Sequence, residues 1–305
     1  MTESLPRGQF VGCLVGLATG DALGAPLEFM TRAEIADTYG EVRDFLGGGW
    51  LNLDPGEYTD DTQLALAITR SILARGAVDP SAIAAAFVAW LRSGPKDAGY
   101  ITRTAIRYHE QGQPWAEVGA RVAREIAGRA AGNGSLTRSA PLGLFHARHP
   151  EALLRDGRLV SELTHAHSLS VWSSLAANLA IGELLHGRRE GLIERVAAQI
   201  PEQAVRDVLL AAPHLSRKAV RSGGFVLETL GAAFWALENH DSFEEVVIAA
   251  TNLGDDADGV GAVAGALAGA REGVAAIPTR WLEQLQGAEQ LAELALGLHR
   301  LAIKS

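Results

Sequence analysis

Oxygen-donor side chains gather in two short segments that lie far apart in the sequence. Thr59, Asp60 and Asp61 are consecutive, and Asp256 and Asp258 form a second acidic pair. Carboxylates this close together repel one another unless cations or protons compensate their charge. Clusters of hard oxygen ligands suit Mg²⁺ or Ca²⁺. We therefore predict that the two segments meet in space and hold divalent metal, and the acids are numerous enough for two Mg²⁺ ions to share.

The first acidic segment also has a purely structural explanation. At a helix start Thr59 can cap the backbone, and Asp60 and Asp61 are favourably placed on the helix dipole. For this segment alone the capping explanation is favoured by about two to one. Because Asp256 and Asp258 repeat the pattern at another predicted helix start, the metal site becomes the stronger interpretation.

A glycine-rich segment, Gly132-Asn133-Gly134-Ser135, has the composition of an anion site. Adjacent backbone N–H groups at a helix start bind anions, and glycine lets a phosphate approach closely. An ordinary Asn-Gly turn followed by a serine cap explains the same residues equally well. The two histidines of the segment 164–167 could contact substrate phosphate or ribose. They are two residues apart and do not share a helix face, so we expect no joint transition-metal site there.

Two helices of small residues are expected to position the acids. Glycine recurs at every fourth position in both, which gives each helix one smooth face that lets another helix approach closely. These glycines are Gly12, Gly16 and Gly20 in the first helix, and Gly261, Gly265 and Gly269 in the second. The first helix, over 7–20, runs into Asp21 and then Glu28, whereas the second, over 256–270, begins at its acids. Packed antiparallel through these faces, they would bring both acid sets together.

The remaining sequence is helical in pattern. No stretch alternates apolar and polar residues for long enough to predict a strand, and Ala, Leu, Glu and Arg, which favour helix, are frequent. Residues 21–58 are glycine-rich without sustained periodicity, so we expect an ordered loop. Further helices are expected from Thr59 or Asp60 to Gly76, over 80–92, 99–110, 115–129 and 135–146, in short pieces after Pro150, over 168–186, on both sides of Pro201, and over 225–239, 243–251 and 279–303. Since the acids must meet from both ends, we predict one all-α domain over 1–305.

Composition argues against several functional classes. The 305 residues are 48% hydrophobic and 21% charged, which is typical of a folded protein. The net charge of −9 argues against a nucleic-acid partner, and the single cysteine, Cys13, fits a reducing compartment. The first ten residues lack the layout of a signal peptide, and the Gly/Ala run 259–270 is too short to span a bilayer. We expect a cytoplasmic monomer without a membrane partner.

Seven motifs resemble, in sequence and in order, the ADP-ribosylglycohydrolase family, which includes the dinitrogenase-reductase-activating glycohydrolase and the ADP-ribosylarginine hydrolases. The motifs are GLATGDALGAPLEF, PGEYTDDT, SGPKDAG, GNGSLTR, THAHS, GGFVLETLGAA and NLGDDADGVGAVAGALAGA. The resemblance covers about residues 8–270, and the pairing of TDDT with GDDAD is its specific part. It implies a single compact all-α domain that binds two Mg²⁺ ions in a cleft for ADP-ribose.

The resemblance also implies roles for single residues. The metal ligands would be Thr59, Asp60, Asp61, Asp256 and Asp258. Glu28 resembles the carboxylate near the scissile bond, and Glu28 or a metal-bound acid such as Asp60 would be the catalytic base. The substrate contacts implied are Asp97 for a guanidinium, Gly132, Asn133, Gly134 and Ser135 for phosphate, His165 for the substrate, and Phe225 beside the ribose.

Two positions depart from the family pattern. Gly259 stands where the family has a threonine whose side chain lies near a metal, so one site is expected to be weaker or completed by water. Thr137 replaces a common methionine, which is a milder change. The sequence thus predicts an Mg²⁺-dependent hydrolase that cleaves the N-glycosidic bond between ADP-ribose and a side chain, most simply arginine. The alternatives are a non-catalytic ADP-ribose or nucleotide binder, a hydrolase of other ADP-ribosyl substrates, and a phosphohydrolase acting on a nucleotide.

Overall fold

The computed structural model describes residues 5–126 and 128–304, and all regular structure within them is helical. Those residues contain no strand, only three isolated β-bridges. The α-helices are α1 (Arg7–Gly24), α2 (Arg32–Tyr39), α3 (Asp60–Arg75), α4 (Pro80–Arg92), α5 (Tyr100–Glu110), α6 (Trp115–Glu125), α7 (Gly134–Thr137), α8 (Ala140–Phe145), α9 (Pro150–Glu162), α10 (Ser168–Leu185), α11 (Leu192–Ala197), α12 (Gln203–Ala211), α13 (Val226–Asn239), α14 (Phe243–Thr251), α15 (Ala257–Glu272), α16 (Thr279–Gln284) and α17 (Ala288–Ala302). Short 3₁₀ turns are η1 (Ala25–Leu27), η2 (Ala212–His214) and η3 (Val274–Ala276). The all-α prediction is confirmed.

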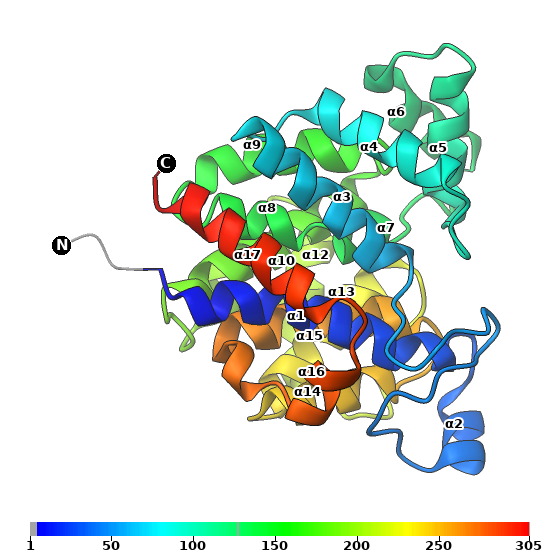
Figure 1. The fold of residues 1–305 in the computed structure, drawn as a ribbon, viewed down its shortest axis with the longest axis vertical. Coiled ribbons are helices and arrows are strands. Elements are labelled where there is room, and N and C mark those ends of the chain that lie inside the picture. The colour runs from blue at the N-terminus through cyan, green and yellow to red at the C-terminus, as the bar shows by residue number, and fades with distance from the viewer. Residues whose placement is uncertain (1–4, 127, 305) are drawn as a thin grey trace.

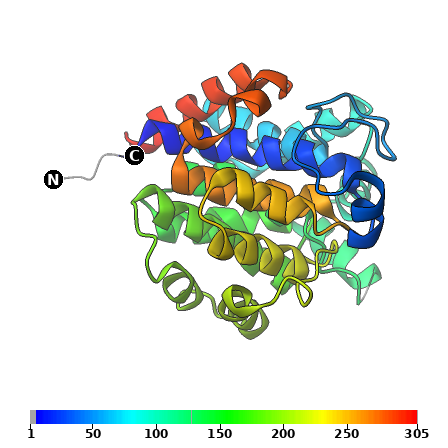
Figure 2. The same cartoon turned by 90° about the horizontal axis from the view of Figure 1, so that it is seen from below.

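Helices α1 and α15 form the centre of the fold, and the other helices surround them (Figures 1 and 2). The predicted antiparallel packing of glycine faces is confirmed by their distances. A methyl group built on Gly265 would lie 2.0 Å from the carbonyl oxygen of Gly16, and one on Gly20 would lie 1.9 Å from that of Gly261. Backbone therefore touches backbone along this pair, which only glycine permits.

Local sequence explains where the helices near the site begin and end. Helix α4 starts with Pro80 at its first position, and the Asp79 side chain caps its N–H groups. Helix α3 ends at Gly76, which adopts the left-handed conformation common at helix C-termini. Both boundaries match the prediction.

Other predicted boundaries were wrong. Helix α1 continues through Asp21 to Gly24, because this carboxylate is satisfied by the start of α3 and need not end the helix. The expected loop 21–58 contains η1 and α2, the latter held by a capping box between Thr31 and Glu34. The single helices expected over 135–146 and 279–303 are each two helices; the second pair is separated by extended backbone at Leu285 and left-handed Gly287. Helix α9 is one helix where short pieces were expected.

Two helical segments, Arg7–Leu27 and Ser168–Leu185, are long and apolar enough to span a membrane by length and composition alone. The apolar window of the first is 100% buried inside the protein, and that of the second is 72% buried. Both are therefore explained as core helices of this fold.

Candidate active site and metal centre

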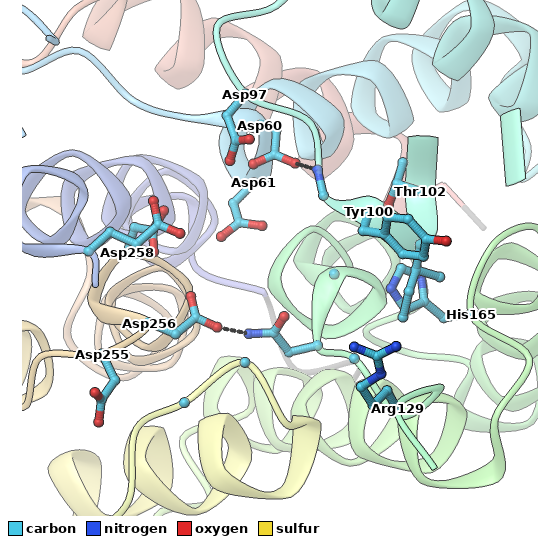
Figure 3. Close-up of a pocket in the computed structure, with 18 of the residues that line it drawn as sticks. Asp60, Asp61, Asp97, Tyr100, Thr102, Arg129, His165, Asp255, Asp256 and Asp258 are labelled. Carbon is cyan, nitrogen blue, oxygen red and sulfur yellow. Dashed lines mark hydrogen bonds between the residues drawn. The ribbon is translucent and has the colours of Figure 1, made fainter. Parts of the chain in front are cut away.

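A cavity of about 950 Å³ opens where the acidic segments meet. Its wall combines the segment after η1, the start of α3, the loop between α4 and α5, the turn before α7, and the start of α15. Acidic side chains occupy one end of it, and glycine backbone with Arg129 and His165 occupies the other (Figure 3). The lining carboxylates are Glu28, Asp60, Asp61, Asp97, Glu228, Asp255, Asp256 and Asp258. The predicted convergence of acids from both ends of the chain is confirmed.

Glycine packing brings Glu28 to Asp256 and Asp258. The contact between α1 and α15 continues to its end, where a methyl group on Gly24 would lie 2.3 Å from the carbonyl oxygen of Ala257. Glu28 follows shortly after, and its ligand atom lies within 4.8 Å of those of Asp256 and Asp258. These three carboxylates form a group that could hold a metal ion.

The start of α3 is fixed by Asp21, which does not line the cavity. Its carboxylate accepts hydrogen bonds from the backbone N–H groups of Thr59 and Thr62, both at 3.0 Å. The hydroxyls of Thr59 and Thr62 donate to the same carboxylate at 2.9 and 2.6 Å. A buried anion thus caps the helix and aims Asp60 and Asp61 into the cavity. The Thr59 hydroxyl, predicted as a metal ligand, is buried and donates a hydrogen bond to Asp21.

Burial raises the pKa values of the clustered acids. It raises the pKa of Asp60 to about 7, with a further contribution from Asp97, and the pKa of Glu28 to about 8. The pKa values of Asp61 and Asp258 lie well above the usual range for the same reason, followed by repulsion from Asp60 and Glu28 respectively. Nearby positive charge lowers the pKa of a carboxylate, so a bound divalent cation would favour the ionised form of these acids, and the donor set fits such a cation.

Arg138 supplies positive charge behind the acids. Its guanidinium is buried, donates to the hydroxyls of Thr102 and Thr164, and lies over the Phe87 ring at 4.6 Å. Burial lowers its pKa to about 10, while Asp60 and Asp61 act in the opposite direction. It makes no direct ion pair with a carboxylate of the described residues, so one buried cation faces several acids and leaves the cavity in need of further positive charge.

The turn before α7 joins the acidic end to the glycine end. Asn133 donates to Asp256 Oδ2 at 2.6 Å and to the Thr229 hydroxyl at 2.9 Å. Gly132 and Gly134 both line the cavity, so their backbone is accessible to a ligand, as the anion-site prediction requires. The Ser135 side chain does not line this cavity; it is buried and hydrogen-bonds the Ser174 hydroxyl at 3.0 Å.

His165 lies directly against the glycine turn. A methyl group on Gly134 would lie 3.1 Å from its ring, and its Nδ1 pairs with the Thr164 hydroxyl at 2.7 Å. Burial and the nearby Arg138 charge hold the pKa of His165 well below its usual range. The ring is therefore neutral at physiological pH and offers a hydrogen-bonding nitrogen to the cavity.

The remaining predicted residues lie at the rim. Asp97 lines the cavity in the loop before α5, and its carboxylate accepts the N–H of Ala98 at 2.6 Å. Phe225 is exposed at the start of α13 and lies outside the cavity wall, although the neighbouring Gly223 and Gly224 belong to it.

Comparison with known proteins identifies the family of this chain. The family model described as ADP-ribosylglycohydrolase matches residues 2–305. The chain belongs to the ADP-ribosylglycohydrolase family. It is 36% identical over 289 residues to the ADP-ribosyl-[dinitrogen reductase] glycohydrolase of Rhodospirillum rubrum, covering 93% of this chain and 92% of that protein. It is 34% identical over 313 residues to the ADP-ribosylarginine hydrolase Tri1 of Serratia proteamaculans (strain 568), covering 99% and 81% respectively.

A solved structure supports the same assignment. The chain superposes with a TM-score of 0.84 and 37% sequence identity on an ADP-ribosylglycohydrolase-related protein complex, covering 97% of this chain and 98% of that one. As a member of this family the protein is a hydrolase that acts on glycosyl bonds. The family is metal-dependent, which agrees with the donor set described above.

The structure shows what surrounds Gly259 and Thr137, the two departures from the ADP-ribosylglycohydrolase pattern. A methyl group on Gly259 would lie 2.8 Å from Asp256 Oδ1 and 3.0 Å from Asn133 Nδ2, so these side chains fill the space a threonine would need. The backbone N–H of Gly259 donates to Asp258 at 2.9 Å. Thr137, in place of methionine, donates its hydroxyl to Asp61 and thereby orients one predicted ligand.

Several residues of this glycohydrolase site escaped the sequence analysis. Arg138 and Arg129 were not assigned roles, because arginine is common on surfaces and only the fold shows that Arg129 lines the cavity and that Arg138 is buried behind its acids. Trp50 lies in the segment expected to be a loop, and it contacts Glu28. The GGGW sequence around it, next to the acidic motifs, was the one available signal.

Proposed function

We propose that this protein removes ADP-ribose from modified arginine side chains in an Mg²⁺-dependent reaction. The proposal rests on the distribution of charged side chains in one cavity. Carboxylates from both ends of the chain occupy one side, and the glycine turn with Arg129 occupies the other. A ligand with a diphosphate at one end and a cationic leaving group at the other matches this arrangement.

The diphosphate would bind at the glycine end. The half-buried backbone of Gly132 and Gly134 lines the cavity and carries no side chain of its own, and the neutral His165 ring lies beside it. Arg129 is the single arginine or lysine among the described residues that line the cavity. A guanidinium binds an oxyanion, whereas the carboxylates at the other end of the cavity would repel one. The diphosphate would therefore lie beside Arg129 and the arginine leaving group beside the acids.

The reacting bond would then lie among the acids. Cleavage breaks the bond between ribose C1 and the guanidine nitrogen, joins a water oxygen to C1, and returns one proton to the departing arginine. Glu28 lines the cavity and would accept the proton of the water, and its raised pKa suits a general base near neutral pH. Asp97 lines the same cavity and would bind the guanidinium through a charge-assisted hydrogen bond. An oxocarbenium-like centre is stabilised by the surrounding carboxylates.

Mg²⁺ would be held by Asp60, Asp61, Asp256 and Asp258, with Thr59 as an additional oxygen donor. When bound, the ions would supply the positive charge that lets these acids ionise together and would orient ribose hydroxyls and water. The protein's own contribution is rigid placement, because Asp21 fixes α3 and Asn133 fixes Asp256.

The test is release of free ADP-ribose from two peptides, one modified on arginine and one on serine, with Mg²⁺ and with excess EDTA. We expect release from the arginine peptide with Mg²⁺ and loss of activity with EDTA. Faster release from the serine peptide would overturn the arginine assignment, and full turnover in EDTA would overturn the metal dependence. Binding of ADP-ribose without any product would support a non-catalytic binder.

A further inference from the structure

Trp50 makes a direct contact with Glu28, one of the carboxylates that line the cavity. Its indole N–H donates to Glu28 Oε2 at 2.5 Å. Within the described residues, no other group donates a hydrogen bond to this carboxylate. The indole nitrogen can donate but not accept, so the contact has one direction only and suits a carboxylate acceptor.

The position of Trp50 is set by backbone. A methyl group on the preceding Gly49 would lie 2.8 Å from Pro26 Cα, so the loop rests tightly on η1, the turn that carries Glu28 at its end. Gly48 and Leu53 exchange two backbone hydrogen bonds, at 2.7 and 2.9 Å, which close the turn around Trp50. The hydrogen bonds hold the shape of the Trp50 loop, and the contact between Gly49 and Pro26 holds this loop against the turn that carries Glu28.

Burial of apolar surface accounts for only part of this tryptophan. Trp50 is 51% exposed, and its neighbouring ring, Phe29, is 69% exposed at a centroid distance of 5.4 Å. Half or more of each ring's surface therefore stays in water, where it gains no hydrophobic stabilisation. What the indole does have is a short hydrogen bond to an acid whose ligand atom lies within 4.8 Å of those of Asp256 and Asp258.

We propose that Trp50 is a positioning residue for catalysis, which holds one oxygen of Glu28 so that the other is presented to the reacting water. Free carboxylates rotate about their last torsion, and a fixed donor on one oxygen removes that freedom. The inference rests on the proposed function, in which Glu28 accepts the proton of the water. Trp50 acts through Glu28 and makes no bond to the substrate.

The experiment compares three variants of the full chain by kcat and KM for ADP-ribose release. Trp50→Phe removes the N–H and part of the ring. Replacement of Trp50 by 3-benzothienylalanine removes only the N–H, because sulfur takes its place in a ring of nearly the same shape. The matched control is Trp90→Phe, which removes an indole hydrogen bond at 2.7 Å to the Gln63 side chain, and neither of these residues lines the cavity of the candidate site.

Both changes at position 50 should lower kcat between about tenfold and a hundredfold, with KM within about twofold of the parent and the thermal midpoint unchanged. Trp90→Phe should leave kcat and KM unchanged. Full activity of the benzothienylalanine variant would overturn the inference, and so would a loss that appears in KM alone, which would make Trp50 a substrate contact. If the parent protein releases no ADP-ribose, the proposed function fails instead, so the two failures are distinguishable.

Discussion

Replacing Gly265 by alanine should destabilise the protein although alanine is the better helix former. The added methyl group would lie 2.0 Å from the Gly16 carbonyl oxygen and 2.8 Å from its carbon. An ordinary carbon–oxygen contact needs more than 1 Å of extra separation, as the usual spacing is about 3.5 Å. Both partners are backbone atoms of central helices, so no side chain can rotate away.

The magnitude follows from two opposing effects. Alanine in place of glycine in a helix interior gains up to about 1 kcal/mol from propensity. Overpacking of a tight core costs about 1–3 kcal/mol, and this backbone clash belongs at or above the upper end of that range. The free energy of unfolding should therefore fall by about 2 kcal/mol or more.

The matched control is Gly182→Ala within α10. Its methyl group would lie 3.9 Å from the Ala147 carbonyl oxygen, which is an ordinary contact. Propensity then acts alone, and stability should rise by up to about 1 kcal/mol. Urea unfolding measures both changes. The reasoning is refuted if Gly265→Ala is as stable as the parent, or if both variants shift stability in the same direction.

Three further predictions concern the site. Arg129→Gln should raise KM about tenfold with kcat unchanged, whereas the neighbouring exposed Arg124→Gln should alter neither; steady-state kinetics on the arginine peptide decide this. Asp21→Asn should lower the free energy of unfolding in urea by about 2 kcal/mol or more, because an amide cannot accept all four hydrogen bonds that the carboxylate receives, and metal affinity measured by calorimetry should fall with it. Without metal, the thermal midpoint should fall as pH rises, because the pKa values of Glu28 and Asp60 are raised to about 8 and 7 in the folded state. The stability that these two protonated groups contribute is fully present below about pH 4, where both also bind their protons in the unfolded chain. It is lost as pH passes 7–8. Added Mg²⁺ should restore the midpoint most at high pH, and a metal-free midpoint that rises from pH 5 to 8.5 would contradict this account.

Much of the architecture was predictable because it depends on local spacing. Glycine at every fourth residue identified both central helices and their contact, since a smooth face has few other uses. Pro80 and Gly76 marked helix ends by fixed backbone preferences. The expected loop over 21–58 was wrong in part, because α2 is short and stabilised by a capping box that its weak periodicity did not reveal.

The acidic residues of the candidate site were predictable from the sequence, but the hydrogen bonds that orient them were not. Asp60, Asp61, Asp256 and Asp258 were identifiable because dense carboxylates are unusual in sequence. The hydrogen bonds that orient them join residues far apart along the chain, and no spacing rule predicts such partners. Asp21 illustrates the limit, since it was recognised as part of an acidic set, yet its carboxylate faces the start of α3 and lies outside the cavity wall.

The pairing of α1 with α15 has a consequence for how the protein forms. These helices stand near opposite ends of the chain, and α17 adds a further contact of the same kind, since His299 hydrogen-bonds the Leu5 carbonyl at 2.9 Å. Long-range contacts of this type slow folding, because a long intervening chain must be ordered before they are made. During synthesis α1 therefore has no α15 to pack against until residues 257–272 have also been made. A shortened chain that stops before Asp256 would lack two of the carboxylates that line the cavity, Asp256 and Asp258.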